Sequence, residues 1–420
     1  MSNDYEAQAE ALGRRARESS RKLALADAAA RNRALAALAA ALRADRAAII
    51  AENAKDLAAG RQAGLPPAML DRLALNESRL EAMAGSIEEI AAQPDVLGQV
   101  IEAWDRPSGL CIERLRVPLG VVLIIFESRP NVTTDAAALC LRSGNACILR
   151  GGREALLSNV ALYRTIRSAL AAAGLPQESV QVVETADHEL VTALVHQERW
   201  IDLVIARGGE KLIRAVVEHA TIPVMKHYKG VCHVYIDEFA DLKMATEIAV
   251  NAKCQRPGVC NAAETLLVHR AHAGPYLAGL LKELSSRGVR IRGCARTRAV
   301  FPASEPATED DWYTEYLDLI LAVRVVDNIE EALDHIAQYG SAHTESIVTD
   351  SRARAEQFVR GVDSSSVMVN ASTRLADGGV YGLGAEIGIS TDKLHARGPV
   401  GARDLTTYKY VVRGRGALRS

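Results

Sequence analysis

The chain has 420 residues, of which 49% are hydrophobic and 24% are charged, a mixture typical of a folded protein and not of a disordered one. Its 50 Lys and Arg residues against 52 Asp and Glu residues leave a net charge of −2, which gives no global reason to bind nucleic acid or an anionic membrane. The apolar runs are too short to span a membrane, the first residues do not form a secretory signal, and the seven cysteines contain no CxxC pair. We therefore expect a cytoplasmic protein of two or three domains with reduced thiols.

The first hundred residues have helical character. Leu35, Leu38, Leu42 and Ile49 share one face of a long Ala-rich helix, and Gly64–Pro67 interrupts it. A second helical stretch follows, and we interpret the whole region as scaffold.

Strands and helices alternate from about residue 110. Leu110–Arg116 alternates apolar and polar residues, and Val121–Phe126 is an apolar run of the kind buried in a parallel sheet. Repeated β-α units predict a parallel sheet with helices on both faces and a ligand at the carboxyl ends of its strands. The further strands that we predict in this part are 146–149, 180–183, 201–205 and 231–236, and the helices are 154–173, 188–196 and 209–218.

A second α/β segment spans roughly residues 243–370, with a helix at Ile329–Gln338. The basic tail 396–413 ends in a strand-like run, Tyr408–Val412. The tail 396–413 and the ribbon 108–126 look like edge strands that could pair between subunits, so we expect a homo-oligomer, specifically a dimer. The strands that we predict in the second segment are 264–268, 289–291, 317–326, 347–349 and 367–369.

Cys260 is the strongest candidate for chemistry. It follows Pro257-Gly258 in a loop just before a predicted strand, where a glycine lets the backbone approach a ligand closely. Lys253 and Arg256 lie nearby in the sequence and favour the thiolate, the nucleophilic form of a cysteine. Buried cysteines are usually inert, but the polar neighbours of Cys260 disfavour that interpretation. Cys254 stays open as the rival nucleophile.

A second cluster, 126–134, lies where a predicted strand meets a predicted helix. Its amides and hydroxyls, with free helix N–H groups, can hold an oxyanion or a phosphate, although a helix cap with a tight turn explains the same residues equally well. Two Arg-Gly-Gly turns, 150–152 and 207–209, follow strands and precede helices, a weak dinucleotide signal because neither matches G-x-G-x-x-G. An arginine directly after a strand can meet a ribose 2′-phosphate, which favours NADP over NAD.

Glycines crowd the segment 377–390, which we interpret as a loop, and the interleaved Tyr381, Leu383 and Ile387 indicate that it packs against something. The histidines and cysteines have no metal-ligand spacing, and H-E-x-x-H, Walker and G-x-S-x-G motifs do not occur in the sequence. We therefore expect no metal.

Several of these segments together resemble the gamma-glutamyl phosphate reductases, a family of the aldehyde dehydrogenase superfamily. They are 126–132 (FESRPNV), 141–152 (LRSGNACILRGG), 251–269 (NAKCQRPGVCNAAETLLVH) and 381–390 (YGLGAEIGIS). The resemblance runs along almost the whole chain, and its 251–269 segment is highly specific. It implies an α/β, aldehyde dehydrogenase-like fold with a Rossmann-type cofactor domain, an α/β catalytic domain and a small β oligomerisation element. We assign 1–107 and 127–242 to the NADPH-binding domain, with 371–390 returning to it, 243–370 to the catalytic domain, and 108–126 and 391–420 to the oligomerisation element.

The resemblance implies an NADP-dependent acyl-phosphate reductase, a phosphorylating aldehyde dehydrogenase of proline biosynthesis. Such an enzyme reduces L-glutamyl 5-phosphate with NADPH to L-glutamate 5-semialdehyde and releases phosphate. The family's nucleophile falls on Cys260, and either Ser128 or Asn131 takes the place of the amide that helps to hold the oxyanion. The other residues implied are Arg150, Gly151, Gly152, Gly208, Gly209 and Glu315 for the cofactor, and Lys253, Arg256 and Asn261 for the substrate.

One departure from the wider superfamily separates two activities. Hydrolytic aldehyde dehydrogenases place a Glu in an E-L-G-G stretch to activate water, whereas the corresponding segment here, Met225–Gly230, has no carboxylate. A thioester on Cys260 would then be left for phosphate, which favours the reductase over the alternative, a hydrolytic NAD(P)-dependent aldehyde dehydrogenase. A non-enzymatic scaffold is a third interpretation, which the intact segment 251–264 opposes. The resemblance also implies a glutamate kinase, expected as a separate polypeptide, and transient contact with it is a hypothesis.

Overall fold

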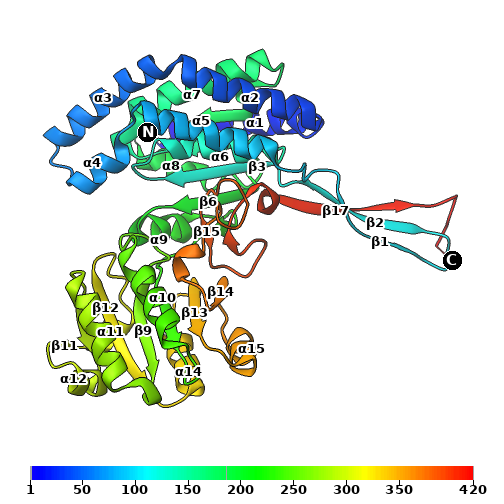
Figure 1. Cartoon of the computed structure of the whole chain (residues 1–420). Helices are drawn as coiled ribbons and strands as arrows, with labels where there is room; N and C mark the ends of the chain where they lie inside the picture. The colour runs from blue at the N-terminus through cyan, green and yellow to red at the C-terminus, as the bar shows by residue number, and fades with distance from the viewer. Residues whose placement is uncertain (1, 186, 420) are drawn as a thin grey trace. The chain divides into compact units, whose positions relative to one another are not determined.

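The computed structural model describes residues 2–185 and 187–419 (Figure 1). The chain divides into two compact units, each built on a parallel sheet of its own. Unit 1 comprises Met1–Lys226, Gly382–Gly388 and Val400–Ser420, and unit 2 comprises His227–Tyr381 and Ile389–Pro399. The two parallel sheets confirm the predicted α/β class. Within the described residues, no helix combines the length and apolar character needed to cross a membrane.

The sheet of unit 1 has five parallel strands in the order β5-β4-β3-β6-β7. Its central strand, β3 (Val121–Phe126), is buried along its whole length, as the apolar run predicts. The other strands are β4 (Ala146–Arg150), β5 (Val180–Val182), β6 (Leu203–Arg207) and β7 (Val224–Met225).

Helices pack around this sheet in unit 1. Leu35, Leu38 and Leu42 of one helix are buried, which confirms the apolar face predicted there, but that helix ends at Ala44 and the buried Ile49 lies on the next helix, so the single long helix that we predicted is wrong. The helices are α1 (Ser2–Leu23), α2 (Ala28–Ala44), α3 (Arg46–Gln62), α4 (Pro67–Leu73), α5 (Glu77–Ala92), α6 (Asn131–Arg142), α7 (Leu156–Ala172), α8 (His188–Leu194) and α9 (Glu210–His219), with short 3-10 turns η1 (Arg153–Ala155), η2 (Gln177–Ser179) and η5 (Ala402–Leu405).

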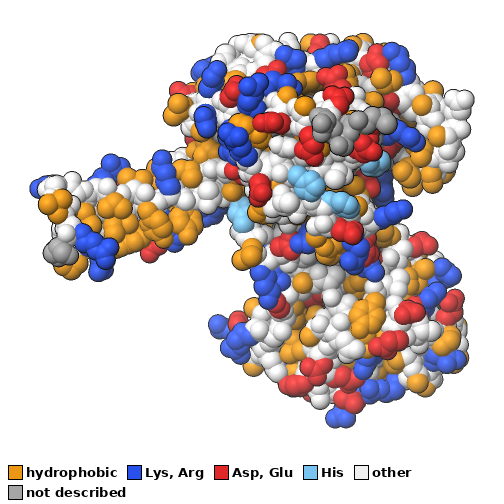
Figure 2. Space-filling model, turned by 180° about the vertical axis from the view of Figure 1, so that it is seen from behind, with side chains coloured by type: hydrophobic (Ala, Val, Ile, Leu, Met, Phe, Trp, Pro, Cys, Tyr) orange, Lys and Arg blue, Asp and Glu red, His pale blue; other side chains and the backbone are white. Residues whose placement is uncertain are grey.

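A three-stranded antiparallel ribbon, here called the arm, extends from the rest of unit 1 (Figure 1). Its middle strand β2 (Cys111–Pro118) pairs with β1 (Val100–Asp105) on one side and with β17 (Thr406–Arg413) on the other. Hydrophobic side chains gather along it (Figure 2), and the exposed ones are Val100, Ile101, Tyr408, Tyr410 and Val412.

Unit 2 has a seven-stranded parallel sheet in the order β11-β10-β12-β9-β8-β13-β14. Leu266 and Val268 of β9 belong to one hydrophobic cluster and Leu267 belongs to another, so helices cover both faces of this sheet. The strands are β8 (Cys232–Ile236), β9 (Ala263–His269), β10 (Arg290–Gly293), β11 (Glu305–Pro306), β12 (Ile320–Val326), β13 (Thr344–Val348) and β14 (Ser366–Val369), and a separate pair is β15 (Ile389–Ser390) with β16 (Gly398–Pro399). The helices are α10 (Leu242–Cys254), α11 (Pro275–Ser286), α12 (Ala295–Val300), α13 (Glu309–Trp312), α14 (Ile329–Tyr339) and α15 (Arg352–Gly361), with 3-10 turns η3 (Arg270–His272) and η4 (Thr373–Leu375).

The structure corrects three of the expected boundaries. Strand β8 pairs with β9 and β13, so the segment 227–242 belongs to unit 2 and not with the first sheet. Strand β3 lies at the centre of the sheet of unit 1 and not in the ribbon 108–126, whereas β1, which we did not predict, lies in the arm. Of 371–390, only 382–388 clusters with unit 1, and 389–399 clusters with unit 2. Apolar strands look alike in sequence, and their pairing is decided by partners far along the chain.

Candidate active site

Cys260 is half-buried on the loop 255–262, between the end of α10 and the start of β9. The start of β8 and the residues just before it support the Cys260 peptide. The Cys232 thiol donates to the Cys260 carbonyl oxygen at 3.2 Å, and the N–H of the buried Gly230 donates to Glu315 Oε1 at 2.9 Å. A Cβ built on Gly230 would lie 1.8 Å from the Cys260 carbonyl oxygen, so only glycine fits there.

A buried ion pair joins the two elements that carry this loop. Lys253 Nζ, near the end of α10, lies 2.6 Å from Glu264 Oε2 on β9, and both side chains are fully buried. Glu264 Oε1 also accepts from the N–H of Leu317 at 3.2 Å. Burial raises the pKa of Glu264 to about 7 against the opposing effect of Lys253, and burial lowers the pKa of Lys253. The expectation that Lys253 binds substrate is corrected, because its ammonium group lies in the core and is held by Glu264.

Asn261 joins the nucleophile loop to η4. Its Nδ2 donates to the carbonyl oxygen of Ala376 at 2.9 Å, and its Oδ1 accepts from Nη1 of Arg374. Arg374 Nε also donates to Gln255 Oε1 at 2.8 Å. Arg374 is not predictable from the sequence, because it is 113 residues away from Asn261 and no local pattern marks it. The amide of Asn261 is thus used within the protein, whereas Arg256 is exposed.

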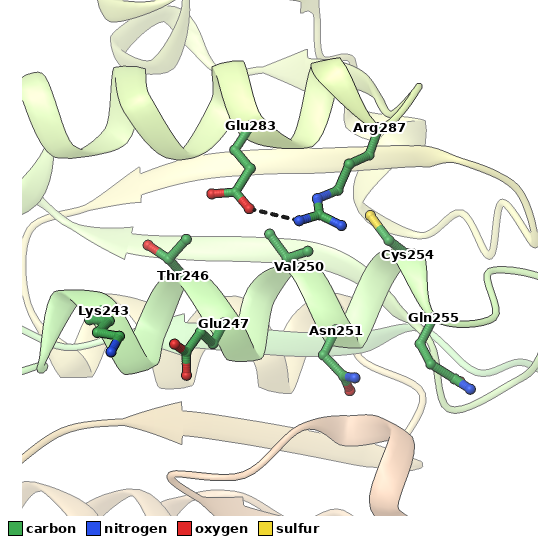
Figure 3. Close-up of a pocket in the computed structure, with 9 residues that line it drawn as sticks. All are labelled: Lys243, Thr246, Glu247, Val250, Asn251, Cys254, Gln255, Glu283 and Arg287. Carbon is green, nitrogen blue, oxygen red and sulfur yellow. Dashed lines mark hydrogen bonds and ion pairs between the residues drawn. The ribbon is translucent and has the colours of Figure 1, made fainter.

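Cys254, the rival nucleophile, lies in a different setting. It lines a pocket of about 670 Å³ between α10 and α11 (Figure 3), where Arg287 Nη2 and Glu283 Oε1 form an ion pair at 3.0 Å. Burial raises the pKa of the Cys254 thiol, although Arg287 and Lys253 oppose the shift, so the nucleophilic thiolate is disfavoured there. The other residues lining the pocket are Lys243, Thr246, Glu247, Val250, Asn251 and Gln255.

The carboxyl ends of β3, β4 and β6 lie next to one another in unit 1 and carry the predicted cofactor turns. Ile125 pairs with Arg150, and Phe126 pairs with Arg207. Glu127 Oε2 accepts from the N–H of Gly209 at 2.9 Å, directly before α9. Carboxylates accept hydrogen bonds from ribose hydroxyl groups, and the N–H groups at the start of a helix can bind a phosphate. This edge of the sheet therefore fits a dinucleotide.

Ser128 lies at the junction between β3 and α6 with a φ of 30°, in the left-handed region that a serine rarely adopts. Its N–H donates to Glu154 Oε1 at 2.9 Å, and its hydroxyl donates to the same oxygen. Asn131, at the start of α6, donates from Nδ2 to Asp135 Oδ2 at 2.9 Å. Desolvation raises the pKa of Asp135 to about 6, and this hydrogen bond opposes the shift. Both candidate oxyanion donors thus already have a carboxylate partner within unit 1.

Arg150 ends β4 and is only 5% exposed. Burial lowers the pKa of its guanidinium, and Glu154 and Glu127 oppose that shift. Gly151 and Gly152 follow in tight packing, since a Cβ would lie 2.1 Å from Asn159 Nδ2 at the first position and 2.3 Å from Glu154 Oε1 at the second. Within the described residues, no group of three or more His, Cys, Asp or Glu side chains is placed to hold a metal ion. The absence of a metal stays a prediction.

Comparison with known proteins agrees with the resemblance. Residues 1–291 match the aldehyde dehydrogenase family. A gamma-glutamyl phosphate reductase from Moorella thermoacetica is 56% identical over 407 residues, 97% of each chain. One from Desulfatibacillum aliphaticivorans is 54% identical over 409 residues, 97% of this chain and 98% of that one. The crystal structure of gamma-glutamyl phosphate reductase from Thermotoga maritima superimposes with a TM-score of 0.96 at 46% identity, over 97% of this chain and 99% of that one. The chain therefore belongs to the aldehyde dehydrogenase family and, within it, to the gamma-glutamyl phosphate reductases.

Proposed function

We propose that this chain reduces L-glutamyl 5-phosphate to L-glutamate 5-semialdehyde and releases phosphate, through a thioester on Cys260. The observation that carries the proposal is the construction of the nucleophile loop. Gly230 and Cys232 contact the Cys260 peptide, the buried Lys253–Glu264 pair joins the two elements that carry the loop, and Cys260 itself is half-buried. Relatives that are 54% and 56% identical over nearly the whole chain are named gamma-glutamyl phosphate reductase, which agrees with this chemistry.

The Cys260 thiolate attacks the carbonyl carbon of the acyl phosphate, so an S–C bond forms and the C–O bond to phosphate breaks. Backbone N–H groups and either Ser128 or Asn131 stabilise the oxyanion, an effect of about 3–4 kcal/mol per donor. A reduced nicotinamide, when bound, supplies the hydride that converts the thioester to a thiohemiacetal. The C–S bond then breaks, the aldehyde leaves and the Cys260 thiolate is restored.

Aldehyde dehydrogenases use NAD or NADP. We assign Arg150, Gly151, Gly152, Gly208 and Gly209 in unit 1 to this cofactor, and Glu315 in unit 2 to its nicotinamide ribose. The preference for NADPH rests on Arg150, whose guanidinium ends β4 where a ribose 2′-phosphate would be bound. Arg150→Gln should raise the KM for NADPH relative to that for NADH, and an unchanged ratio would contradict the assignment.

The hydrolytic alternative is not favoured, because Met225–Gly230 contains no carboxylate to activate water. The two activities differ in their need for phosphate. In the reverse direction the proposed enzyme oxidises glutamate semialdehyde with NADP only when phosphate is present, whereas a hydrolytic enzyme needs none.

The nucleophile is tested by a matched pair of variants. Cys260→Ala should abolish phosphate-dependent reduction of NADP by the semialdehyde, while Cys254→Ala should retain it within a few-fold. Mass spectrometry of wild-type protein trapped with acyl phosphate, in the absence of reduced cofactor, should find the adduct on Cys260. Turnover retained by Cys260→Ala, or an adduct on Cys254, would overturn the assignment.

The arm supports a further expectation, that the chain forms a dimer. Its exposed apolar residues (Figure 2) and its edge strands β1 and β17 could be covered by a second copy. A monomeric mass in light scattering would contradict this. Transient contact with a separate glutamate kinase and a cytoplasmic location stay predictions, and co-elution of the two enzymes would test the contact.

A further inference from the structure

Two arginines from different parts of the chain lie at the nucleophile loop. Arg256 belongs to the loop itself, and Arg374 reaches it from η4. Arg374 contacts both ends of the loop, because it donates to Gln255 Oε1 at 2.8 Å and to Asn261 Oδ1. Asn261 is in turn fixed by its bond to the carbonyl oxygen of Ala376. The Arg374 guanidinium is therefore held beside Asn261, the residue directly after Cys260, and does not rotate freely in solvent.

The charges at this place do not balance. Burial lowers the pKa of Arg374, and the nearby Arg256 lowers it further, whereas Asp377 and Cys260 act in the opposite direction. Across 2–185 and 187–419, no carboxylate forms an ion pair with Arg256 or Arg374. Several other arginines of unit 2 have such a partner, as Arg354 has in Glu238 at 2.6 Å. Two neighbouring guanidinium groups without a carboxylate partner form a ready site for an anion with several oxygens.

We propose that Arg374, together with Arg256, binds the phosphate group of the acyl phosphate, first on the substrate and then as it leaves. This inference rests on the proposed function and goes beyond it by naming the residues that take the leaving group. It replaces Lys253, which the ion pair with Glu264 holds in the core.

Chemistry favours the phosphate over the substrate's other anion. The phosphate is bonded to the carbon that Cys260 attacks, so its oxygens must lie close to the nucleophile, whereas the α-carboxylate lies at the far end of the carbon chain. When the C–O bond breaks, its electron pair goes to the phosphate, and the leaving oxygen takes up a proton from water. The guanidinium groups stay protonated and stabilise the negative charge that builds up on the phosphate in the transition state.

The reverse reaction tests the proposal, because phosphate and glutamate semialdehyde can then be varied independently. Loss of a charge-assisted hydrogen bond predicts at least a tenfold increase in the KM for phosphate in Arg374→Gln, with the KM for the semialdehyde changed less than about twofold. Arg374→Lys keeps the positive charge but loses the paired N–H donors of the guanidinium group. Its KM for phosphate should therefore lie between those of wild type and Arg374→Gln. Arg360→Gln, an exposed position on α15 in the same unit, is the matched control and should behave like wild type.

A second measurement does not depend on turnover. Inorganic phosphate should slow the alkylation of Cys260 by iodoacetamide in wild-type protein and protect Arg374→Gln much less. If Arg374→Gln fails to fold, Arg256→Gln, at an exposed position, should show the same loss of protection.

An unchanged KM for phosphate with full protection would overturn the proposal. An increase confined to the KM for the semialdehyde would also overturn it and would assign Arg374 to the α-carboxylate. If wild-type protein shows no phosphate-dependent turnover, the proposed function itself fails, a result that is distinct from either outcome for the variants.

Discussion

The nucleophile loop of unit 2 and the strand ends of unit 1 differ in which groups their carboxylates contact. At the strand ends, carboxylates of the protein accept hydrogen bonds from backbone N–H groups: Glu127 accepts from Gly209, and Glu154 accepts from Ser128. At the nucleophile loop, the carboxylate of Glu264 is turned inward onto Lys253, and two arginines remain without a carboxylate partner in the described chain. The first region suits a ligand rich in hydroxyl groups, and the second suits an anion that arrives and leaves in each turnover.

The two regions also differ in how tightly the backbone is packed. A Cβ on Gly230 would overlap the backbone of Cys260 at 1.8 Å, whereas a Cβ on Gly151 at the strand ends would meet a side-chain atom, Asn159 Nδ2, at 2.1 Å. A side chain can move aside more easily than a peptide can, so the nucleophile loop tolerates less change than the strand ends do.

The largest effect is expected from Gly230→Ala. The added methyl group cannot fit against the Cys260 carbonyl oxygen, so the loop must shift, and a displacement of a nucleophile by about 1 Å can cost on the order of a hundredfold in rate. We expect kcat/KM to fall by at least that factor. Gly85→Ala on α5, its matched control in unit 1, should lose less than about fivefold because a Cβ there has no neighbouring atom within 4 Å. Equal losses in the two variants would remove the contrast in packing.

Lys253→Met should cause the largest loss of stability among these changes. It leaves Glu264 buried without its cation, and breaking a buried pair typically costs about 3–5 kcal/mol. Lys243→Met, on the exposed start of the same helix, is the control and should cost little. Urea denaturation measures both.

The loss in Lys253→Met should depend on pH with a defined sign. The pKa of Glu264 is already raised to about 7 in the folded protein, and without Lys253 it rises further. Above its ordinary pKa the unfolded chain loses this proton while the folded chain keeps it, so the stability of the variant falls as pH rises toward the folded pKa. A deficit that shrinks as pH rises would contradict this account.

Sequence patterns predicted the local part of this structure well. The apolar run of β3, the β-α alternation and the Arg-Gly-Gly turns at the ends of β4 and β6 all depend on neighbouring residues. The pairing of β8 with β9 and β13 does not, because a short apolar strand fits either sheet. Strand β1 was missed, since its residues are exposed or half-buried and lack the apolar alternation that marks a strand.

The candidate site divides in the same way. Cys260 and Arg256 lie in one recognisable segment. Arg374 is 113 residues away from its partner Asn261, and Glu315 is 85 residues away from its partner Gly230. Lys253 looked like a substrate cation from its place in the sequence. Only the packing of α10 on β9 shows that its side chain points at Glu264 in the core.

A smaller effect concerns His343, which lies under the nucleophile loop with its Nδ1 3.7 Å from Cys232 Sγ and 2.8 Å from Thr344 Oγ1. Burial, with a smaller contribution from His227, lowers the pKa of this fully buried histidine to about 3. Below pH 6.5 the unfolded chain gains a proton that the folded chain cannot take, so stability falls by about 1.4 kcal/mol per pH unit down to the folded pKa. His343→Gln should remove that much of the slope between pH 6 and about pH 4, whereas His219→Gln, exposed on α9 of unit 1, should not. If the stability of His343→Gln and of wild type changed in parallel with pH, the role of His343 in the pH dependence would be contradicted.

The smallest effect is expected from Glu127→Gln at the strand ends of unit 1. The amide oxygen can still accept from the N–H of Gly209, so the change removes mainly the attraction between a carboxylate and the positive end of α9, about 0.3–1 kcal/mol. Salt screens such an exposed interaction, so the difference from wild type in urea denaturation should shrink as ionic strength rises. A loss as large as that of Lys253→Met, or one that salt leaves unchanged, would mean that this carboxylate is built into the fold as firmly as Glu264 is, and the contrast between the two regions would then lie in their charge alone.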